Sequence, residues 1–260
     1  MNTVLLKVIV TPALIGTASL AGRRWGHSIS GWLIALPLTT GPVTFFLALT
    51  HGASYAATAA AGTLAGGFSQ AAFLLCYALL ASHWKWLPTL AVSMLAFAVI
   101  TATLQRLIIP LVPLWLLVLL GFALALRLLP HTKDPAIPTD KLPSRWDIPL
   151  RMIIATLFVL LITGLAPAFG PRLTGLLAPF PIFTTILASF ALHQYGLEAT
   201  INVLRGTLMG LFAFASFFFV IAILIEPAGI LIAFLVAILV VIGLQGFSLW
   251  LLRRRPGRNG

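Results

Sequence analysis

Long apolar runs, each close to the length of a membrane span, alternate with short polar or tryptophan-flanked breaks along the chain. A helix crosses the hydrocarbon core of a bilayer with about 20 predominantly apolar residues. The pattern therefore predicts an all-α polytopic membrane protein with about nine transmembrane helices. Their expected spans are 3–22, 30–50, 54–82, 86–104, 107–129, 149–169, 173–193, 198–225 and 227–251.

The break at Gln105 and Arg106 decides this count, because it divides one long apolar tract. Pro110 and Pro113 follow the break, and proline is favoured in the first turn of a new helix. Basic residues outside the spans collect on the cytoplasmic side of a membrane. With the break, one side receives Arg23, Arg24, Lys85, Lys133, Lys141, Arg145, Arg151 and Arg253–Arg255, and the other keeps little beyond Lys7, Arg106 and Arg172. We therefore expect a bacterial inner-membrane protein with its N-terminus outside and its C-terminus in the cytoplasm.

An internal repeat emerges when the sequence is shifted by 144 residues, which sets Gly52 on Gly196 without a gap. Glycine and proline coincidences carry the match, because leucine and alanine are common throughout the chain. The aligned pairs include Gly31 with Gly175, Pro37 with Pro181, Thr40 with Thr184, Phe46 with Phe190, and Gly62-Thr63-Leu64 with Gly206-Thr207-Leu208. Spans one to four then fall on spans six to nine, and span five has no partner.

Five spans separate equivalent points of the two copies, so the second copy must enter the membrane in the opposite direction. The expected fold is an inverted five-helix repeat with the last helix missing, forming one integral membrane domain. Repeat 1 covers residues 1–129, a cytoplasmic linker covers 130–148, and repeat 2 with its basic tail covers 149–260. The match of span one with span six also favours a retained helix over a cleaved secretory signal. In many secondary transporters the substrate site lies where inverted copies meet.

Proline interrupts the second span of each copy. It frees backbone carbonyls, which need partners inside hydrocarbon. Paired broken helices at corresponding places in two halves indicate a transport site. The candidate substrate-binding residues are Pro37, Thr39 and Thr40 in the first copy and Pro181, Thr184 and Thr185 in the second. The alternative is that these threonines only satisfy the kinked backbone.

A polar stripe marks the start of the eighth span, where Glu198, Asn202 and Arg205 share one helix face. A guanidinium about two turns inside a span usually faces a cavity or a partner, so Arg205 is suited to hold an anionic group. The alternative is that Arg205 extends to the headgroups while Glu198 favours the helix N-terminus. Gln70, at similar depth in the third span, is a further substrate-binding candidate, and its alternative role is an interhelical hydrogen bond.

Composition agrees with a bilayer protein and excludes several classes of function. The chain is 60% hydrophobic and 8% charged. Its formal net charge of +11 does not indicate nucleic-acid binding, because the basic residues lie between the spans. The single cysteine, Cys76, allows no internal disulfide, and the scattered histidines indicate no metal site. Sequence motifs of metalloproteases, phosphate-binding loops and serine hydrolases are missing, so we expect no enzyme and no cofactor.

A family resemblance rests on the segment Leu173–Thr185, followed by Gly196-Leu197-Glu198-Ala199 and Gly206–Gly210. This part of the chain resembles the core of the small GlpM-like bacterial inner-membrane proteins. Those proteins are roughly half as long, so the chain resembles a fused, inverted pair of them. The resemblance implies no functional residues, and the inverted five-helix plan is similar to drug/metabolite transporters only by analogy.

The function expected is that of a secondary transporter or exporter, acting by alternating access on a small solute that is anionic if Arg205 binds it. The alternative is a lipid-head-group flippase or an envelope-biogenesis accessory protein, and a third option is a scaffold without a substrate path. A closed polar cavity favours a solute, a groove open to lipid favours a lipid, and a dry, packed centre favours a scaffold. The expected partners are membrane lipids and a small-molecule or lipid substrate, and the sequence is compatible with a homodimer.

Overall fold

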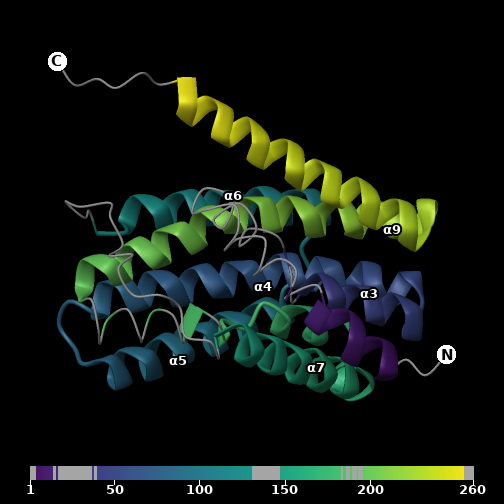
Figure 1. The fold of residues 1–260 in the computed structure, drawn as a ribbon, viewed down its shortest axis with the longest axis horizontal. Coiled ribbons are helices and arrows are strands. Elements are labelled where there is room, and N and C mark those ends of the chain that lie inside the picture. The colour runs from purple at the N-terminus through teal and green to yellow at the C-terminus, as the bar shows by residue number, and fades with distance from the viewer. Residues whose placement is uncertain are drawn as a thin grey trace.

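Helices make up the regular structure of the protein (Figure 1). The computed structural model describes residues 4–13, 16, 37, 40–130, 147–182, 184–185, 188, 192 and 196–254, and no strand occurs in these ranges. An apolar helix at Val4–Ala13 is followed by α3 (Thr40–His51), α4 (Ala53–Leu80), α5 (Trp86–Arg106), α6 (Leu111–Leu128), α7 (Asp147–Leu177) and α9 (Leu197–Arg254).

Five of the described helices, α4, α5, α6, α7 and α9, are long and apolar enough to cross a membrane. Large apolar side chains point outward along them; Leu95 on α5, Leu120 on α6 and Leu239 on α9 are each more than half exposed. Extended apolar surface of this kind marks contact with a membrane or a partner. The expectation of an all-helical, membrane-embedded protein is therefore met.

The break expected near Gln105 and Arg106 is confirmed. Helix α5 ends at Arg106, residues 107–110 are not helical, and α6 begins at Leu111 directly after Pro110. Proline at this position has a φ that suits a helix start and lacks an amide that would need a partner. The sequence therefore located the boundary between these two helices correctly.

Two of the helices, α7 and α9, each contain an internal break at a glycine. Gly170 has φ 71° and Gly229 has φ 82°, conformations that favour glycine. The 58 residues of α9 would reach about 87 Å as one straight helix, far beyond a hydrocarbon core of about 30 Å. Figure 1 shows the part after Gly229, in yellow, running back over the bundle. The expected boundaries near 169–173 and 225–227 coincide with these breaks, whereas the total of nine spans stays a prediction.

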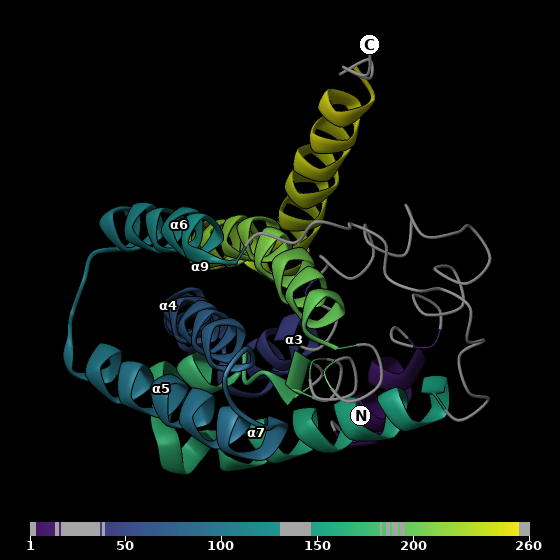
Figure 2. The same cartoon turned by 90° about the vertical axis from the view of Figure 1, so that its left-hand side faces the viewer.

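Helix α4 is the centre of the bundle. It contacts α3, α5, α6, α7 and α9, and Figure 2 shows it between one layer of α6 and α9 and another of α5 and α7. Small residues make this central position possible, because they let neighbouring backbones approach closely. A Cβ atom added at Gly62 would lie 2.5 Å from the Arg172 carbonyl oxygen, and one at Gly66 would lie 2.5 Å from that of Leu176. These two glycines therefore pack α4 against the end of α7.

The backbone repeats specific features at the 144-residue offset. Gly52, before α4, has φ 91°, and its counterpart Gly196, before α9, has φ 84°. The amide of Gly41 donates to the carbonyl of Pro37 at 2.7 Å, and the amide of Thr185 donates to that of Pro181 at 2.8 Å. In the two halves, helices therefore begin and are separated from one another at equivalent positions.

Burial follows the same offset. The buried residues Thr89, Ser93 and Phe97 form one stripe of α5. Their counterparts in the part of α9 after Gly229 are buried as well: Ala233, Ala237 and Val241. Helix α4 and the first part of α9 agree likewise at four fully or almost fully buried pairs: Ala60 with Leu204, Leu64 with Leu208, Phe73 with Phe217, and Tyr77 with Ile221. Corresponding helices thus turn corresponding faces inward, while the opposite orientation of the two halves stays a prediction.

Candidate functional site

The proline-containing stretches lie where helices begin. Pro37 precedes α3, whose first residue, Thr40, is buried, and Thr39 lies outside the described residues. In the second copy Pro181 and Thr184 are buried. The Thr185 hydroxyl oxygen is buried without a hydrogen-bond partner among the described residues. The expectation of irregular backbone at Pro37 and Pro181 is met, and the role of the threonines in binding a substrate stays a prediction.

The three residues of the polar stripe of the eighth span lie in different environments. Glu198 is exposed in the first turn of α9, and Asn202 is half-buried. Arg205 is half-buried and donates a hydrogen bond from Nη2 to the Pro130 carbonyl oxygen at 2.8 Å. Its Nε atom is buried without a partner in the described part of the chain. Arg205 therefore binds the chain just beyond the end of α6.

Gln70 lies half-buried on the central helix α4. One residue earlier, the buried Ser69 hydroxyl accepts a hydrogen bond from the Thr101 hydroxyl of α5 at 3.0 Å. Polar contacts between α4 and α5 therefore exist at this depth. Gln70 remains a candidate for substrate binding.

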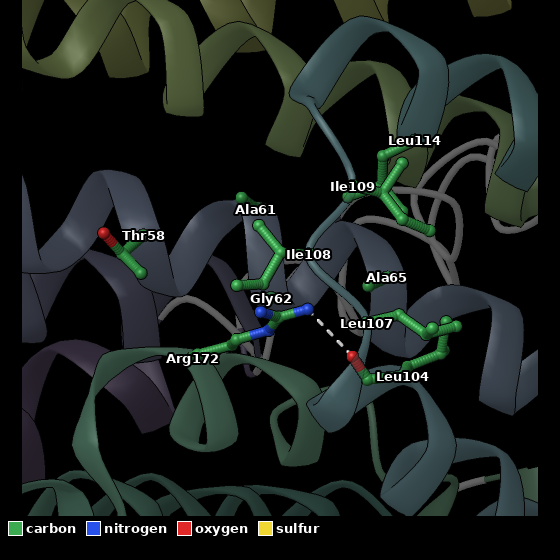
Figure 3. Close-up of a pocket in the computed structure, with 10 residues that line it drawn as sticks. All are labelled: Thr58, Ala61, Gly62, Ala65, Leu104, Leu107, Ile108, Ile109, Leu114 and Arg172. Carbon is green, nitrogen blue, oxygen red and sulfur yellow. Dashed lines mark hydrogen bonds between the residues drawn. The ribbon is translucent and has the colours of Figure 1, made fainter.

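A pocket of about 140 Å³ lies at Arg172, a residue that sequence reasoning did not include among the candidates. We call it the Arg172 pocket (Figure 3). It is lined by Thr58, Ala61, Gly62, Ala65, Leu104, Leu107, Ile108, Ile109, Leu114 and Arg172. None of the ten predicted substrate-binding residues is in this set.

Local sequence explains how the Arg172 pocket forms. Gly170 breaks α7, and Pro171 and Arg172 then start its second part. Gly62 lets that part approach the backbone of α4, as its added Cβ would meet the Arg172 carbonyl. On the other side the chain leaves α5 and runs without helix through Ile108, whose side chain is 89% exposed. The pocket therefore lies between α4, the break in α7 and the connection from α5 to α6.

The Arg172 guanidinium crosses the pocket and donates from Nη2 to the Leu104 carbonyl oxygen at 2.8 Å (Figure 3). Leu104 lies in the last turn of α5, where its carbonyl also accepts from the Leu107 amide at 3.3 Å and the helix dipole favours a cation. Within the described residues, neither Arg172 nor Arg205 forms an ion pair with a carboxylate. Each guanidinium is therefore held by a carbonyl group and keeps its full positive charge available.

The α4 wall of the Arg172 pocket corresponds to the predicted polar stripe of α9. At the 144-residue offset, Thr58 falls on Asn202 and Ala61 falls on Arg205. Each half therefore has an arginine beside the same helix face, supplied by α7 in one case and by α9 in the other. The available signal for Arg172 was its place among the few basic residues on the predicted outer side, immediately after Gly170-Pro171.

A second, open hollow of about 380 Å³ lies at Trp84, Lys85, Trp86 and Leu192. Both tryptophans are nearly half exposed at the connection between α4 and α5. An indole beside a lysine at a helix end is typical of the boundary between headgroups and hydrocarbon. We therefore interpret Trp84, Lys85 and Trp86 as residues that anchor the protein in the membrane, and not as a binding site.

The chain matches no protein-family model, no curated protein and no solved structure. Its resemblance to the GlpM-like proteins therefore stays a prediction.

Proposed function

We propose that the protein is a secondary transporter that moves a small anionic solute across the bacterial inner membrane by alternating access. The observation that carries this proposal is the pair of arginines at corresponding helix faces. Arg172 lies against the stripe of α4 that contains Ala61, and Arg205 occupies the corresponding position of α9. Both donate to a carbonyl group at or just beyond the end of another helix.

The opposite orientation of the two halves places these arginines near opposite membrane faces. In this arrangement the N-terminus lies outside, Arg172 is near the outer face and Arg205 near the cytoplasmic face. Shared features at the 144-residue offset support two copies of one unit, among them the positive φ values of Gly52 and Gly196. Transporters built from inverted copies alternate between an outward-open and an inward-open form. A cation near each opening suits an anionic substrate.

Charge balance favours an anion as the substrate. Arginine has five N–H donors and stays protonated, and a single carbonyl group neither neutralises the charge nor occupies all the donors. Arg205, about two turns inside the eighth span, is costly there unless it is paired. Because the described residues provide no carboxylate partner, an incoming anion supplies the missing charge.

A lipid-head-group flippase is the second candidate function. It is favoured by the connection from α5 to α6, where Ile108 lines the Arg172 pocket and is 89% exposed. Leu107 and Ile109 line the same side. A head group could enter past these apolar side chains while its acyl chains stay in the bilayer. A dry scaffold is less compatible with a pocket that contains a cation.

The experiment is a transport assay with the full-length protein in proteoliposomes, using a panel of small organic and inorganic anions. The variants are Arg205→Ala, Arg172→Gln and Thr184→Val, with Arg127→Ala as the control because Arg127 is exposed in the last turn of α6. The proposal predicts saturable uptake of at least one anion, lost in both arginine variants and retained in the control. Uptake of no anion above protein-free vesicles contradicts a solute transporter, and normal uptake by Arg205→Ala and Thr184→Val contradicts the assigned site.

A further inference from the structure

We propose that the Arg172 pocket binds the phosphate group of an amphiphile, with the apolar chain of that ligand lying outside the pocket past Ile108. This inference rests on the proposed binding of an anion and narrows its class to a phosphate amphiphile, which includes the substrate of the second candidate function, the lipid-head-group flippase. The phosphate is either that of a phospholipid head group or that of a soluble alkyl phosphate, and both present the same chemistry to the protein.

The guanidinium supplies the recognition. Among the described residues, Nη2 of Arg172 has one hydrogen-bond partner, the Leu104 carbonyl oxygen, and no described group occupies the other donors of the planar group. In Figure 3 the group lies across the pocket, beside Gly62 and below Ile108. Arginine forms paired, charge-assisted hydrogen bonds with phosphate oxygens. Thr58 lines the same pocket on the side away from Leu104 and offers a hydroxyl donor.

The Arg172 pocket is large enough for a head group but too small for a whole lipid. A volume of about 140 Å³ holds a polar group of a few heavy atoms. It accommodates a phosphate and a short polar substituent, but not an acyl chain. The apolar part of an amphiphile must therefore remain outside the pocket.

The walls of the Arg172 pocket fit a ligand that has a polar head group and an apolar chain. On α4 they are small, at Ala61, Gly62 and Ala65, which leaves room beside the guanidinium. On the connecting segment they are branched and apolar, at Leu107 and Ile108, both exposed. A fully soluble anion makes no contact with these exposed apolar side chains, whereas the chain of an amphiphile packs against them.

A purely structural role for Arg172 predicts different behaviour. If the guanidinium only holds the end of α5, filling the pocket while keeping the arginine changes no binding. Ala61→Leu makes that change, since Ala61 lines the pocket and its replacement leaves the hydrogen bond between Arg172 and Leu104 in place. Arg172→Gln removes the charge, and Arg106→Gln removes an equal charge from an exposed site at the end of α5 outside the pocket.

The test measures binding instead of transport, so its failure is distinguishable from failure of the proposed function. Full-length protein in nanodiscs is analysed by native mass spectrometry for retained phosphatidylglycerol against phosphatidylcholine. Protein in detergent is titrated in parallel with hexyl phosphate, with hexanol as the uncharged match. Size-exclusion profiles establish that each variant is folded.

The proposal predicts that wild type and Arg106→Gln bind one phosphate amphiphile, and that Arg172→Gln and Ala61→Leu bind it about tenfold more weakly or not at all. Retained phosphatidylglycerol identifies a lipid as the source, and hexyl phosphate alone identifies a soluble ligand. Binding of neither probe, or equal binding by all four proteins, overturns the proposal. Loss in Arg172→Gln without loss in Ala61→Leu also overturns it, because the phosphate would then lie outside the pocket.

Discussion

The Nη2 atom of Arg172 donates a hydrogen bond of 2.8 Å to the carbonyl oxygen of Leu104, 68 residues earlier in the chain. This bond joins the end of α5 in the first half to the break of α7 in the second. It adds a second donor to a carbonyl at the end of α5 that also accepts from the Leu107 amide at 3.3 Å. The same bond fixes the guanidinium inside the Arg172 pocket, so one contact serves both the packing of the halves and the proposed site.

Replacing Arg172 by alanine should lower the free energy of unfolding by about 1.5–3 kcal/mol, the contribution of a hydrogen bond to a charged group. Unfolding of the purified protein in detergent, followed by circular dichroism, measures the change. Arg106→Ala, at an exposed position, should change stability by no more than about 0.5 kcal/mol. Equal effects of the two substitutions would show that the contact with Leu104 contributes nothing.

Gly175 should tolerate no side chain. An added Cβ would collide with the backbone of α4 at Ala59 and would lie 2.9 Å from the Thr63 amide nitrogen. We expect Gly175→Ala to destabilise the protein by about 1–3 kcal/mol through overpacking. Gly164→Ala is the control in the same helix, because its Cβ would meet no described atom within 4 Å. That change should be neutral or stabilising by about 0.5–1 kcal/mol. Comparable thermal midpoints for the two variants would contradict the close approach of α4 and α7.

The paired glycines Gly52 and Gly196 should respond alike to substitution. Both have positive φ, and no described atom lies within 4 Å of an added Cβ, so strain of the backbone is the main cost. Alanine at either position should cost about 1–3 kcal/mol, the strain of a positive-φ conformation that residues with a Cβ rarely adopt. Gly206→Ala, inside α9 and with open space around it, should not be destabilising. A loss at one paired glycine but none at the other would weaken the equivalence of the halves.

The hydrogen bond from Thr101 to Ser69 should couple α5 to α4. Interhelical hydrogen bonds in membrane proteins average about 0.6 kcal/mol and reach about 1.7 kcal/mol. A double-mutant cycle of Thr101→Val and Ser69→Ala should give a coupling free energy in that range, since both hydroxyls are buried at 3.0 Å. Additive effects of the two substitutions would show that the bond does not stabilise the pair.

Local signals in the sequence located much of the fold. Pro110 and the polar pair Gln105-Arg106 predicted the division of α5 from α6, because proline and charge act within one or two turns. Small residues let helices approach closely, and Gly62 and Gly66 provide such an approach against α7. No described atom lies within 4 Å of a Cβ at Gly206, so the counterpart of Gly62 makes no such approach within the described part of the chain.

The Arg172 pocket could not be derived from the sequence in the same way. Its walls come from α4, from the α5–α6 connection and from α7, and no short-range pattern relates Thr58 to Arg172. The polar stripe of the eighth span predicted Arg205 instead, and Arg205 donates to the Pro130 carbonyl just beyond α6. Only the 144-residue offset connects the two arginines, since it sets Ala61 of the pocket on Arg205.

The opposite orientation of the halves is the central claim, and Ser82 and Glu226 test it most directly. They are equivalent at the 144-residue offset, and both are exposed: Ser82 lies in the turn after α4, and Glu226 lies in α9 just before the break at Gly229. Replacing Cys76, the single cysteine, by alanine gives a background in which Ser82→Cys and Glu226→Cys are labelled one at a time with a membrane-impermeant maleimide. We predict that Glu226→Cys reacts in intact cells and that Ser82→Cys reacts only after the inner membrane is permeabilised. Reaction of both cysteines from the same side would contradict the inverted arrangement and remove the basis of the transport proposal.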